Sequence, residues 1–248
     1  MSLLNKMKIQ PALGVFSKTT DSAFVEAAGI AGLDFIILDC EHGPITSETL
    51  HNHVRAAKLT NINSIVRVKN LDTHAIGAAL DTGAAGVQIP NINTAQQAIE
   101  AVEAARFYPM GKRGVCRFVR AAAFGTEDKS EYFNNANQSI VILQVEGLEG
   151  VNNIDAILDV PNFDVLFIGP YDLSQSIGKP GEVNSPEVLG LMRKIAKKAK
   201  AKNIILGAFC DTLENAQLLK KEGFTYIAYS VDVNIFINAV NDLKKSLI

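Results

Sequence analysis

The sequence has few cysteines, and they suggest neither a disulfide framework nor a structural zinc site. Cys40, Cys116 and Cys210 are odd in number, far apart in the chain and without a C-x-x-C pair. Unpaired cysteines of this kind are typical of reducing compartments. We therefore expect a cytoplasmic protein.

Neither sign of charge predominates, and no long hydrophobic run is present. The chain has 24 Lys and Arg against 26 Asp and Glu, a formal net charge of −2. A protein that binds nucleic acid needs a basic face to neutralise phosphates, so the expected partner is a small molecule instead. No segment approaches the roughly 18 apolar residues that a membrane span requires, and residues 1–6 lack the apolar stretch of a signal peptide. We expect no membrane association.

The glycine motifs of nucleotide sites are also absent. In an open doubly wound sheet, G-x-G-x-x-G or a P-loop would follow the first strand. Here the first predicted strand runs into Gly14-Val15-Phe16-Ser17, which lacks the glycine spacing that lets the backbone approach a pyrophosphate. We therefore discount ATP and NAD as ligands.

The chain does contain a regular alternation of short β-branched runs and amphipathic segments. Strands are predicted at 12–16, 34–41, 63–68, 85–91, 139–147, 163–170, 203–210 and 224–231. Helices are predicted at 21–31, 46–58, 72–81, 94–106, 150–158, 186–201, 212–222 and 233–246, with caps at Asp21, Thr46, Thr94 and Ser185. This pattern predicts a parallel (β/α)₈ TIM barrel, an α/β fold, as a single domain over residues 1–248. An irregular insertion at about 107–138 is expected to fold across the barrel mouth as part of the active site.

Acidic residues end two consecutive predicted strands. The apolar run 141–145 leads to Glu146, and the run 165–168 leads through Gly169-Pro170-Tyr171 to Asp172. In a parallel barrel both carboxylates would face one cavity, and hard oxygen ligands without cysteine or paired histidines favour Mg²⁺ or Mn²⁺. The alternative is that each acid pairs with a lysine or arginine.

An arginine and a histidine also follow predicted strands. Arg67 is suited to a substrate carboxylate or a developing enolate, unless an internal salt bridge engages it. His42 can exchange protons near neutral pH, unless it is only hydrogen-bonded in a loop. We expect His51, His53 and His74 to be structural or solvated.

Five motifs carry a resemblance over roughly residues 12–240. They are Asp39-Cys40-Glu41-His42-Gly43-Pro44, Val66-Arg67, 108–115 (YPMGKRGV), Gln144-Val145-Glu146 and 167–174 (FIGPYDLS). In order and spacing they resemble the HpcH/HpaI aldolase family. The resemblance implies a TIM barrel of the phosphoenolpyruvate/pyruvate-binding type and a class II, metal-dependent pyruvate aldolase. Named activities of this kind are 2,4-dihydroxyhept-2-ene-1,7-dioate aldolase and 2-keto-3-deoxy sugar acid aldolase.

The resemblance also implies roles for individual residues. The positions of the metal ligands correspond to Glu146 and Asp172, for Mg²⁺, Mn²⁺ or Co²⁺. The catalytic positions correspond to His42, Arg67 and Asp81. Pyruvate would lie against Gln144, Gly169, Pro170 and Tyr171. Asp81 matches an acid that acts on the histidine of a neighbouring subunit. Members are commonly homohexamers with exchanged C-terminal helices, which corresponds here to 233–248.

The implied reaction cleaves or forms a C–C bond of a 4-hydroxy-2-oxo acid, giving pyruvate and an aldehyde through a pyruvate enolate. We expect no Schiff base, because the nearest lysines to the predicted strand ends are Lys69 and Lys179. Two alternatives stay open. One is a related metal-dependent lyase or synthase with an oxo acid or acyl-CoA partner, and the other is a non-catalytic metabolite-binding barrel.

Four residues depart from the family pattern. Cys40 stands where a small residue is frequent, and Tyr171 stands where alanine is frequent, so the pocket is expected to be narrower or more polar. Arg117 and Arg120 lie in a stretch that usually has small residues. They could recognise an extra anionic group on the acceptor, or be solvated loop arginines.

Overall fold

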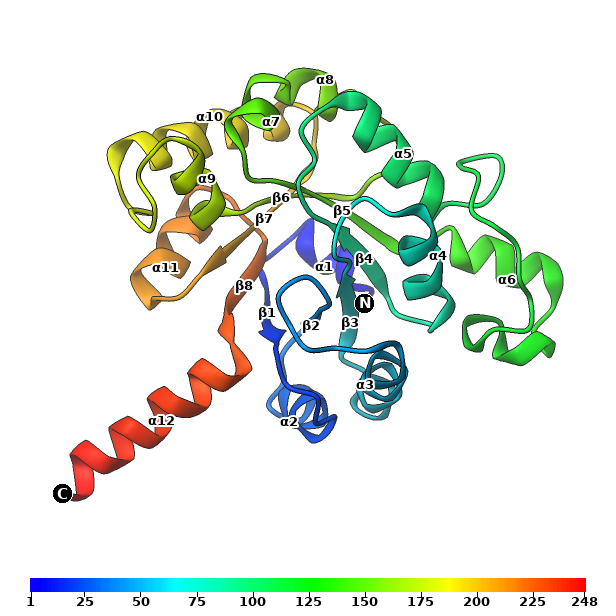
Figure 1. Cartoon of the computed structure of the whole chain (residues 1–248), viewed down its shortest axis with the longest axis horizontal. Helices are drawn as coiled ribbons and strands as arrows, with labels where there is room; N and C mark the ends of the chain where they lie inside the picture. Colours follow the sequence, from blue (N-terminus) through cyan, green and yellow to red (C-terminus); the bar gives the residue numbers. More distant parts are fainter.

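The computed structural model describes residues 1–248 and forms a closed barrel of eight parallel strands (Figure 1). The strands are β1 (Ala12–Ser17), β2 (Phe35–Asp39), β3 (Asn63–Arg67), β4 (Gly86–Ile89), β5 (Ile140–Val145), β6 (Val165–Ile168), β7 (Ile205–Cys210) and β8 (Tyr226–Val231). Each strand pairs with the next in the chain, and β8 closes the barrel on β1. The predicted (β/α)₈ fold is confirmed.

Helices surround the barrel. They are α1 (Leu3–Met7), α2 (Ala23–Ile30), α3 (Ser47–Thr60), α4 (Thr73–Asp81), α5 (Ala95–Ala105), α6 (Lys129–Ala136), α7 (Leu148–Asn152), α8 (Ile154–Leu158), α9 (Pro170–Ser176), α10 (Pro186–Ala201), α11 (Leu213–Lys221) and α12 (Asp232–Leu247), with a 3₁₀ helix η1 (Arg120–Gly125). Thr46, Thr94 and Ser185 cap their helices as predicted. No helix is both long and apolar enough to cross a bilayer.

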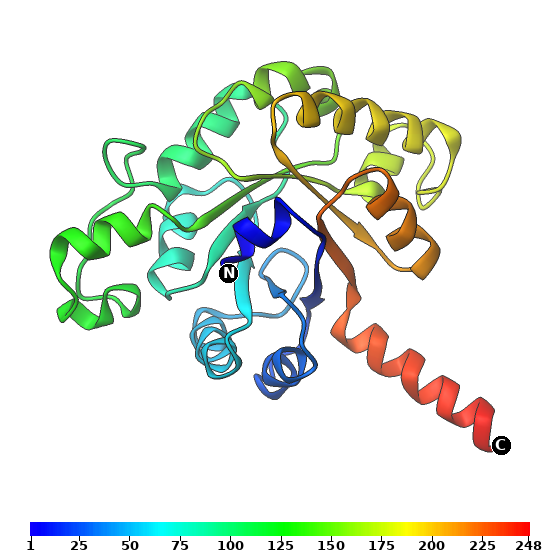
Figure 2. The same ribbon diagram turned by 180° about the vertical axis from the view of Figure 1, so that it is seen from behind.

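The strands are buried on both faces, as expected for a barrel filled inside and covered outside. The inner core contains alternate strand residues such as Phe35 and Tyr226, whose rings stack with centroids 3.9 Å apart. Leu3 and Met7 of α1 join this inner core, and Figure 2 shows α1 lying over the barrel axis. Packing therefore closes the amino end of the barrel and leaves the carboxyl end available for a site.

The insertion at 107–138 does not lie across the mouth of its own barrel, contrary to expectation. Arg106, just after α5, donates to the carbonyl oxygens of Asn137 and Ser139, and Arg120 donates to that of Thr82. All these partners lie in connections that lead from a helix to the next strand. Such connections lie at the amino ends of parallel strands, because each helix runs back from the mouth. The insertion is therefore anchored at the amino end of the barrel, and α6 lies at its side (Figure 1).

Helix α12 extends away from the barrel in both views (Figures 1 and 2). Only Asp232, its first residue, is buried. Its exposed apolar residues are Val233, Ile235, Phe236, Ile237, Val240, Leu243 and Leu247. This chain alone provides nothing that covers this apolar face.

Candidate functional site

A cavity of about 170 Å³ opens at the carboxyl ends of the strands. Its lining includes four predicted site residues that carry charge or an amide: Arg67, Gln144, Glu146 and Asp172. They come from β3, from β5 and its end, and from the start of α9. The barrel thus brings together residues that are up to 105 positions apart in the sequence (172 − 67 = 105).

Glu146 is buried and held in one orientation. Its Oε1 accepts from the backbone N–H of Asn91 at 2.9 Å, and its Oε2 accepts from the Gln144 amide, which is itself bonded to Gln88. A Cβ at position 169 would lie 2.5 Å from Oε2, so Gly169 is what lets the carboxylate fit. Burial, with the charge of nearby Asp172, raises the pKa of Glu146 to about 7.

Glu146 and Asp172 fit a divalent cation that keeps most of its coordination for water and substrate. No group of three or more His, Cys, Asp or Glu has metal-site spacing. Mg²⁺ is nevertheless commonly held by one or two carboxylates. Burial is the main cause of the raised pKa of Glu146, and repulsion from Asp172 adds to it; a bound cation would act against both. Neither acid makes an ion pair with a lysine or arginine, which counts against the alternative raised from the sequence.

Arg67 lines the same cavity as these acids, and its guanidinium is held in one orientation by its neighbours. Its Nε and Nη2 donate to the two oxygens of Asp39 at 2.9 and 2.8 Å, and its Nη1 lies 3.0 Å from Glu41. It also stacks over the Phe16 ring, with Cζ 4.7 Å from the centroid. The internal salt bridge considered as an alternative therefore exists, but Arg67 still lines the cavity and has N–H groups to spare.

Two charged residues of the site, Asp39 and Lys18, were missed. Asp39 is fully buried and pairs with Arg67 and with Lys18, whose Nζ lies 2.7 Å away. Burial raises the pKa of Asp39, but Arg67 and Lys18 outweigh it and hold the pKa at about 2. Lys18 lines the cavity, whereas Lys69, which the sequence argument considered, does not. The in-register pairing of Asp39 with Arg67 on neighbouring strands could have revealed the first ion pair.

His42 and Asp81 are not brought together within one chain. The His42 side chain is 62% exposed, does not line the cavity and lies 3.9 Å from the Glu41 carboxylate. Asp81 ends α4, at the amino end of the barrel, and pairs with the buried Arg113 at 2.6 Å. A contact between the two would need two copies of the chain.

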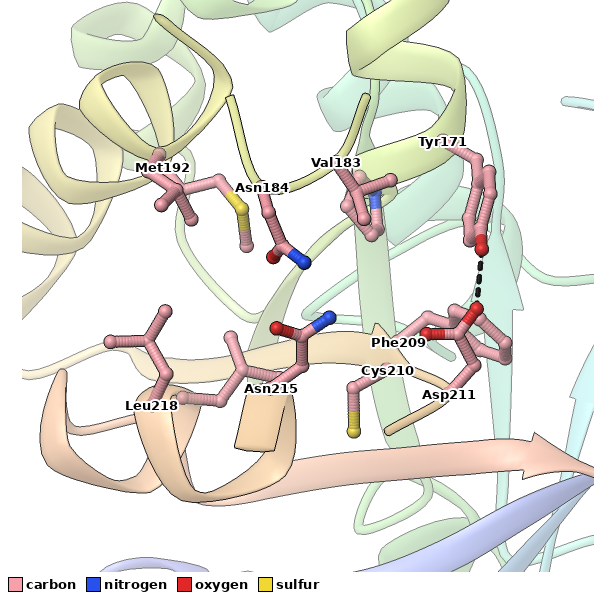
Figure 3. A pocket seen from close by; sticks show the side chains of 12 residues that line it. Tyr171, Val183, Asn184, Met192, Phe209, Cys210, Asp211, Asn215 and Leu218 are labelled. Carbon is pink, nitrogen blue, oxygen red and sulfur yellow. Dashed lines mark hydrogen bonds between the residues drawn. The ribbon is translucent and has the colours of Figure 1, made fainter. Parts of the chain in front are cut away.

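The residues expected beside pyruvate are all in the cavity wall: Gln144, Gly169, Pro170 and Tyr171. Tyr171 donates a hydrogen bond to Asp211, which raises the pKa of Tyr171 to about 12. Figure 3 shows this bond at the edge of a second, mainly apolar cleft that contains Asn184 and Asn215. The Tyr171–Asp211 bond therefore forms part of the wall between the two clefts.

The remaining sequence expectations concern residues outside the cavity. Arg117 and Arg120 do not line the cavity and donate to the backbone carbonyls of Glu127 and Thr82, so their binding of an anionic group on the acceptor stays a prediction. His53 is buried and bonded to Ser22 and to the carbonyl of Thr19, as a structural residue. Cys40 is only partly buried, and burial raises its pKa to about 11.

Comparison with known proteins agrees with this geometry. The sequence matches the HpcH/HpaI aldolase/citrate lyase family over residues 12–239. A 5-keto-4-deoxy-D-glucarate aldolase from Enterobacter sp. (strain 638) is 33% identical over 94% of this chain and 91% of the relative. The crystal structure of a family protein from Burkholderia cenocepacia J2315 has a TM-score of 0.93 at 30% identity, covering 99% and 98% of the two chains. Citrate synthase SbnG has a TM-score of 0.88 at 27% identity over 99% and 97%. The chain therefore belongs to the HpcH/HpaI aldolase/citrate lyase family, whose named aldolases are carbon–carbon lyases.

Proposed function

We propose that the protein is a metal-dependent aldolase that cleaves a 4-hydroxy-2-oxo acid to pyruvate and an aldehyde. The observation that carries the proposal is one cavity with two unpaired carboxylates, Glu146 and Asp172, on one side and an oriented arginine, Arg67, on the other. The first side suits a cation that binds a 2-oxo acid, and the second suits the negative charge that develops as the bond breaks.

Glu146 and Asp172 would hold Mg²⁺, Mn²⁺ or Co²⁺, which supplies Lewis-acid polarisation of the 2-oxo group when bound. The C4 hydroxyl passes its proton to a base, the C3–C4 bond breaks to give the aldehyde, and its electron pair forms the pyruvate enolate. A proton returned to C3 then gives pyruvate. The N–H groups of Arg67 that remain free of Asp39 and Glu41 would donate to the enolate oxygen. Gln144, Gly169, Pro170 and Tyr171 would form the wall against the 2-oxo acid.

His42 is the proposed acid and base at the C4 oxygen, with Asp81 of a second copy acting on it. Asp81 lies at the amino end of its own barrel, at the opposite end from the His42 of the same chain. In addition, α12 has an apolar face that its own chain leaves uncovered. We propose a homohexamer with exchanged α12 helices, so that each site is completed at a subunit boundary. The absence of any disulfide supports the proposed cytoplasmic location.

The deciding test is pyruvate release from a panel of 4-hydroxy-2-oxo acids, with and without EDTA. We expect turnover that EDTA abolishes and that added Mg²⁺ or Mn²⁺ restores. Glu146→Gln and Asp172→Asn should each abolish it while the circular dichroism spectrum stays unchanged. Activity like the wild type in either metal-stripped variant would refute the metal assignment.

A synthase is the second candidate, favoured by the similarity to citrate synthase SbnG. The same enolate stabilisation would serve condensation with an oxo acid or an acyl-CoA. Incubation of the enzyme with oxo acid pairs and acetyl-CoA, analysed by mass spectrometry, separates the two. A non-catalytic metabolite-binding barrel would show ligand binding without product in either assay.

A further inference from the structure

Lys18 places a second cation in the cavity, beside the proposed machinery. It follows β1 and is the only lysine or arginine besides Arg67 among the residues that line the cavity. Its Nζ lies 2.7 Å from Asp39, and its side chain is 27% exposed. The cations Lys18 and Arg67 thus lie on either side of Asp39, at the ends of β1, β2 and β3.

Most of the hydrogen bonds to Asp39 come from groups other than Lys18. Oδ1 accepts from Arg67 Nε and from the backbone N–H groups of Glu41 and His42, while Oδ2 accepts from Arg67 Nη2. The Lys18 Nζ lies 2.7 Å from Oδ2, whose remaining lone pair it can engage with one N–H group. An ammonium has three N–H groups and Asp39 can engage one, so the Lys18 ammonium has donors to spare for a ligand.

The backbone at Lys18 is fixed, so the ammonium is held at the cavity. Its N–H donates to both oxygens of Asp232 at 3.0 and 3.1 Å, and the Ser17 hydroxyl donates to the same carboxylate at 2.9 Å. Asp232 is itself buried. A flexible four-carbon stem thus starts from a fixed point and ends in the cavity.

We infer that Lys18 is a specificity-determining residue that binds a second carboxylate, on the part of the substrate that leaves as the aldehyde. The inference rests on the proposed function, in which the 2-oxo acid end lies towards Glu146 and Asp172. That end is occupied by the proposed cation, so the ammonium that follows β1, four strands round the barrel from β5, is left for the other end of the molecule. The substrate class is therefore a 4-hydroxy-2-oxo diacid.

The competing role for a lysine in an aldolase is a Schiff base with the 2-oxo group. That reaction needs the neutral amine, because its nitrogen lone pair attacks the carbonyl carbon. The Nζ of Lys18 is instead engaged in an ion pair with the buried Asp39 carboxylate, 2.7 Å away. Borohydride reduction in the presence of pyruvate should therefore leave the mass of Lys18 unchanged.

A binding experiment tests the inference without requiring turnover. Calorimetry with Mn²⁺ present compares 2-oxoglutarate with 2-oxopentanoate, which has the same five-carbon chain and no second carboxylate. We expect the diacid to bind about 10-fold tighter or more, the size of one hydrogen bond between charged groups. Lys18→Met should remove this difference, and Lys18→Arg should keep most of it. Lys18→Gln, which keeps a donor for Asp39, replaces the Met variant if that one does not fold.

The matched control is Lys69→Met, which removes an exposed lysine that follows β3 outside the cavity, and its diacid preference should equal that of the wild type. Three outcomes would overturn the inference. The wild type could bind both acids equally, Lys18→Met could weaken both equally, or Lys18 could form an adduct with pyruvate. A Lys18-dependent diacid preference without cleavage of any 4-hydroxy-2-oxo acid would refute the aldolase proposal and leave the Lys18 site standing. Cleavage of a 4-hydroxy-2-oxo acid without any preference for the diacid would refute the Lys18 site and leave the aldolase proposal standing.

Discussion

At the scale of single residues, the site consists of charged groups whose states are set by burial and by one or two neighbours. Asp39 is buried yet ionised, because Arg67 and Lys18 compensate it. Glu146 is buried without a cationic partner. Burial raises its pKa to about 7, so its neutral form is favoured at pH values below this pKa. The site therefore contains two kinds of buried acid. Ion pairs stabilise the ionised form of Asp39, whereas burial destabilises the ionised form of Glu146.

Glu146 should make the metal-free protein less stable as the pH rises. Its pKa is raised from an ordinary 4.5 to about 7, so its stability contribution is fully present below pH 4.5 and is lost as the pH rises through 7. The loss is roughly 3 kcal/mol at most by linkage. Glu146→Gln keeps the neutral form, so in EDTA its Tm should fall less between pH 5 and 8 than that of the wild type. Glu149→Gln, in neighbouring α7, is the control, and parallel Tm profiles for Glu146→Gln and wild type would contradict the assignment.

Arg67→Lys should fail to support activity although it keeps the charge. A lysine cannot reproduce the fork that bonds both oxygens of Asp39 while further N–H groups face the cavity. We expect kcat/KM to fall about 100-fold or more, as for the loss of an oriented donor to a developing anion. Steady-state pyruvate release measures this, and kcat/KM equal to that of the wild type would make Arg67 a structural residue only.

At the scale of elements, the junction between β6 and α9 determines how closely two site residues approach. Gly169 lies against Glu146, while Asp172 sits in the first turn of α9, which starts at Pro170. The short turn from strand to helix thus places one acid beside the other. This helix was not predicted, because its seven residues are too few for an apolar period to be recognised.

Gly169→Ala should weaken metal binding with little effect on the fold. The added Cβ would lie 2.8 Å from the Glu146 Cβ and 2.5 Å from Oε2, so the carboxylate must move. We expect about 10-fold weaker Mn²⁺ binding by calorimetry, comparable to other losses of support for a metal ligand. Gly190→Ala in α10 is the control, since its Cβ would meet nothing within 4 Å. Unchanged Mn²⁺ affinity in Gly169→Ala would remove Glu146 from the metal site.

Much of the barrel could be predicted from sequence, because strand period, cap residues and strand ends are local signals. All eight strands were predicted within about two residues of their observed ends.

Lys18 was missed because the first strand was ended at Phe16, one residue before its observed end at Ser17. The Asp81–Arg113 pair joins a helix end to the insertion, and no local pattern encodes such a contact. The predicted position of the insertion across the mouth is wrong because α5 has already returned to the amino end of the barrel before the insertion begins.

At the scale of the whole molecule, the chain has features that one barrel does not use. The apolar face of α12 is uncovered, and Asp81 and His42 lie at opposite ends of the barrel. Large exposed apolar patches usually mark an interface. A closed oligomer would cover the helix and could bring an Asp81 to a His42.

Subunit mixing tests the shared site. Asp81→Asn and His42→Ala should each be inactive alone, and after exchange of subunits some sites should contain an intact Asp81 and an intact His42. We expect partial recovery of pyruvate release, with light scattering confirming an oligomer. A monomer, or no recovery after exchange has been verified with labelled subunits, would contradict the arrangement.

The buried carboxylate of Asp232 links helix α12 to Lys18 at the cavity. It begins α12, the helix proposed to dock on a neighbour, and it also accepts hydrogen bonds from the Ser17 hydroxyl and the backbone N–H of Lys18. A ligand that needs Lys18 in place and a neighbour that needs α12 in place would then favour the same conformation. Thermodynamic reciprocity requires that each strengthens the other by the same factor. A 2-oxo diacid should therefore lower the protein concentration at which the oligomer dissociates, measured by sedimentation velocity, and Asp232→Asn should uncouple ligand from assembly.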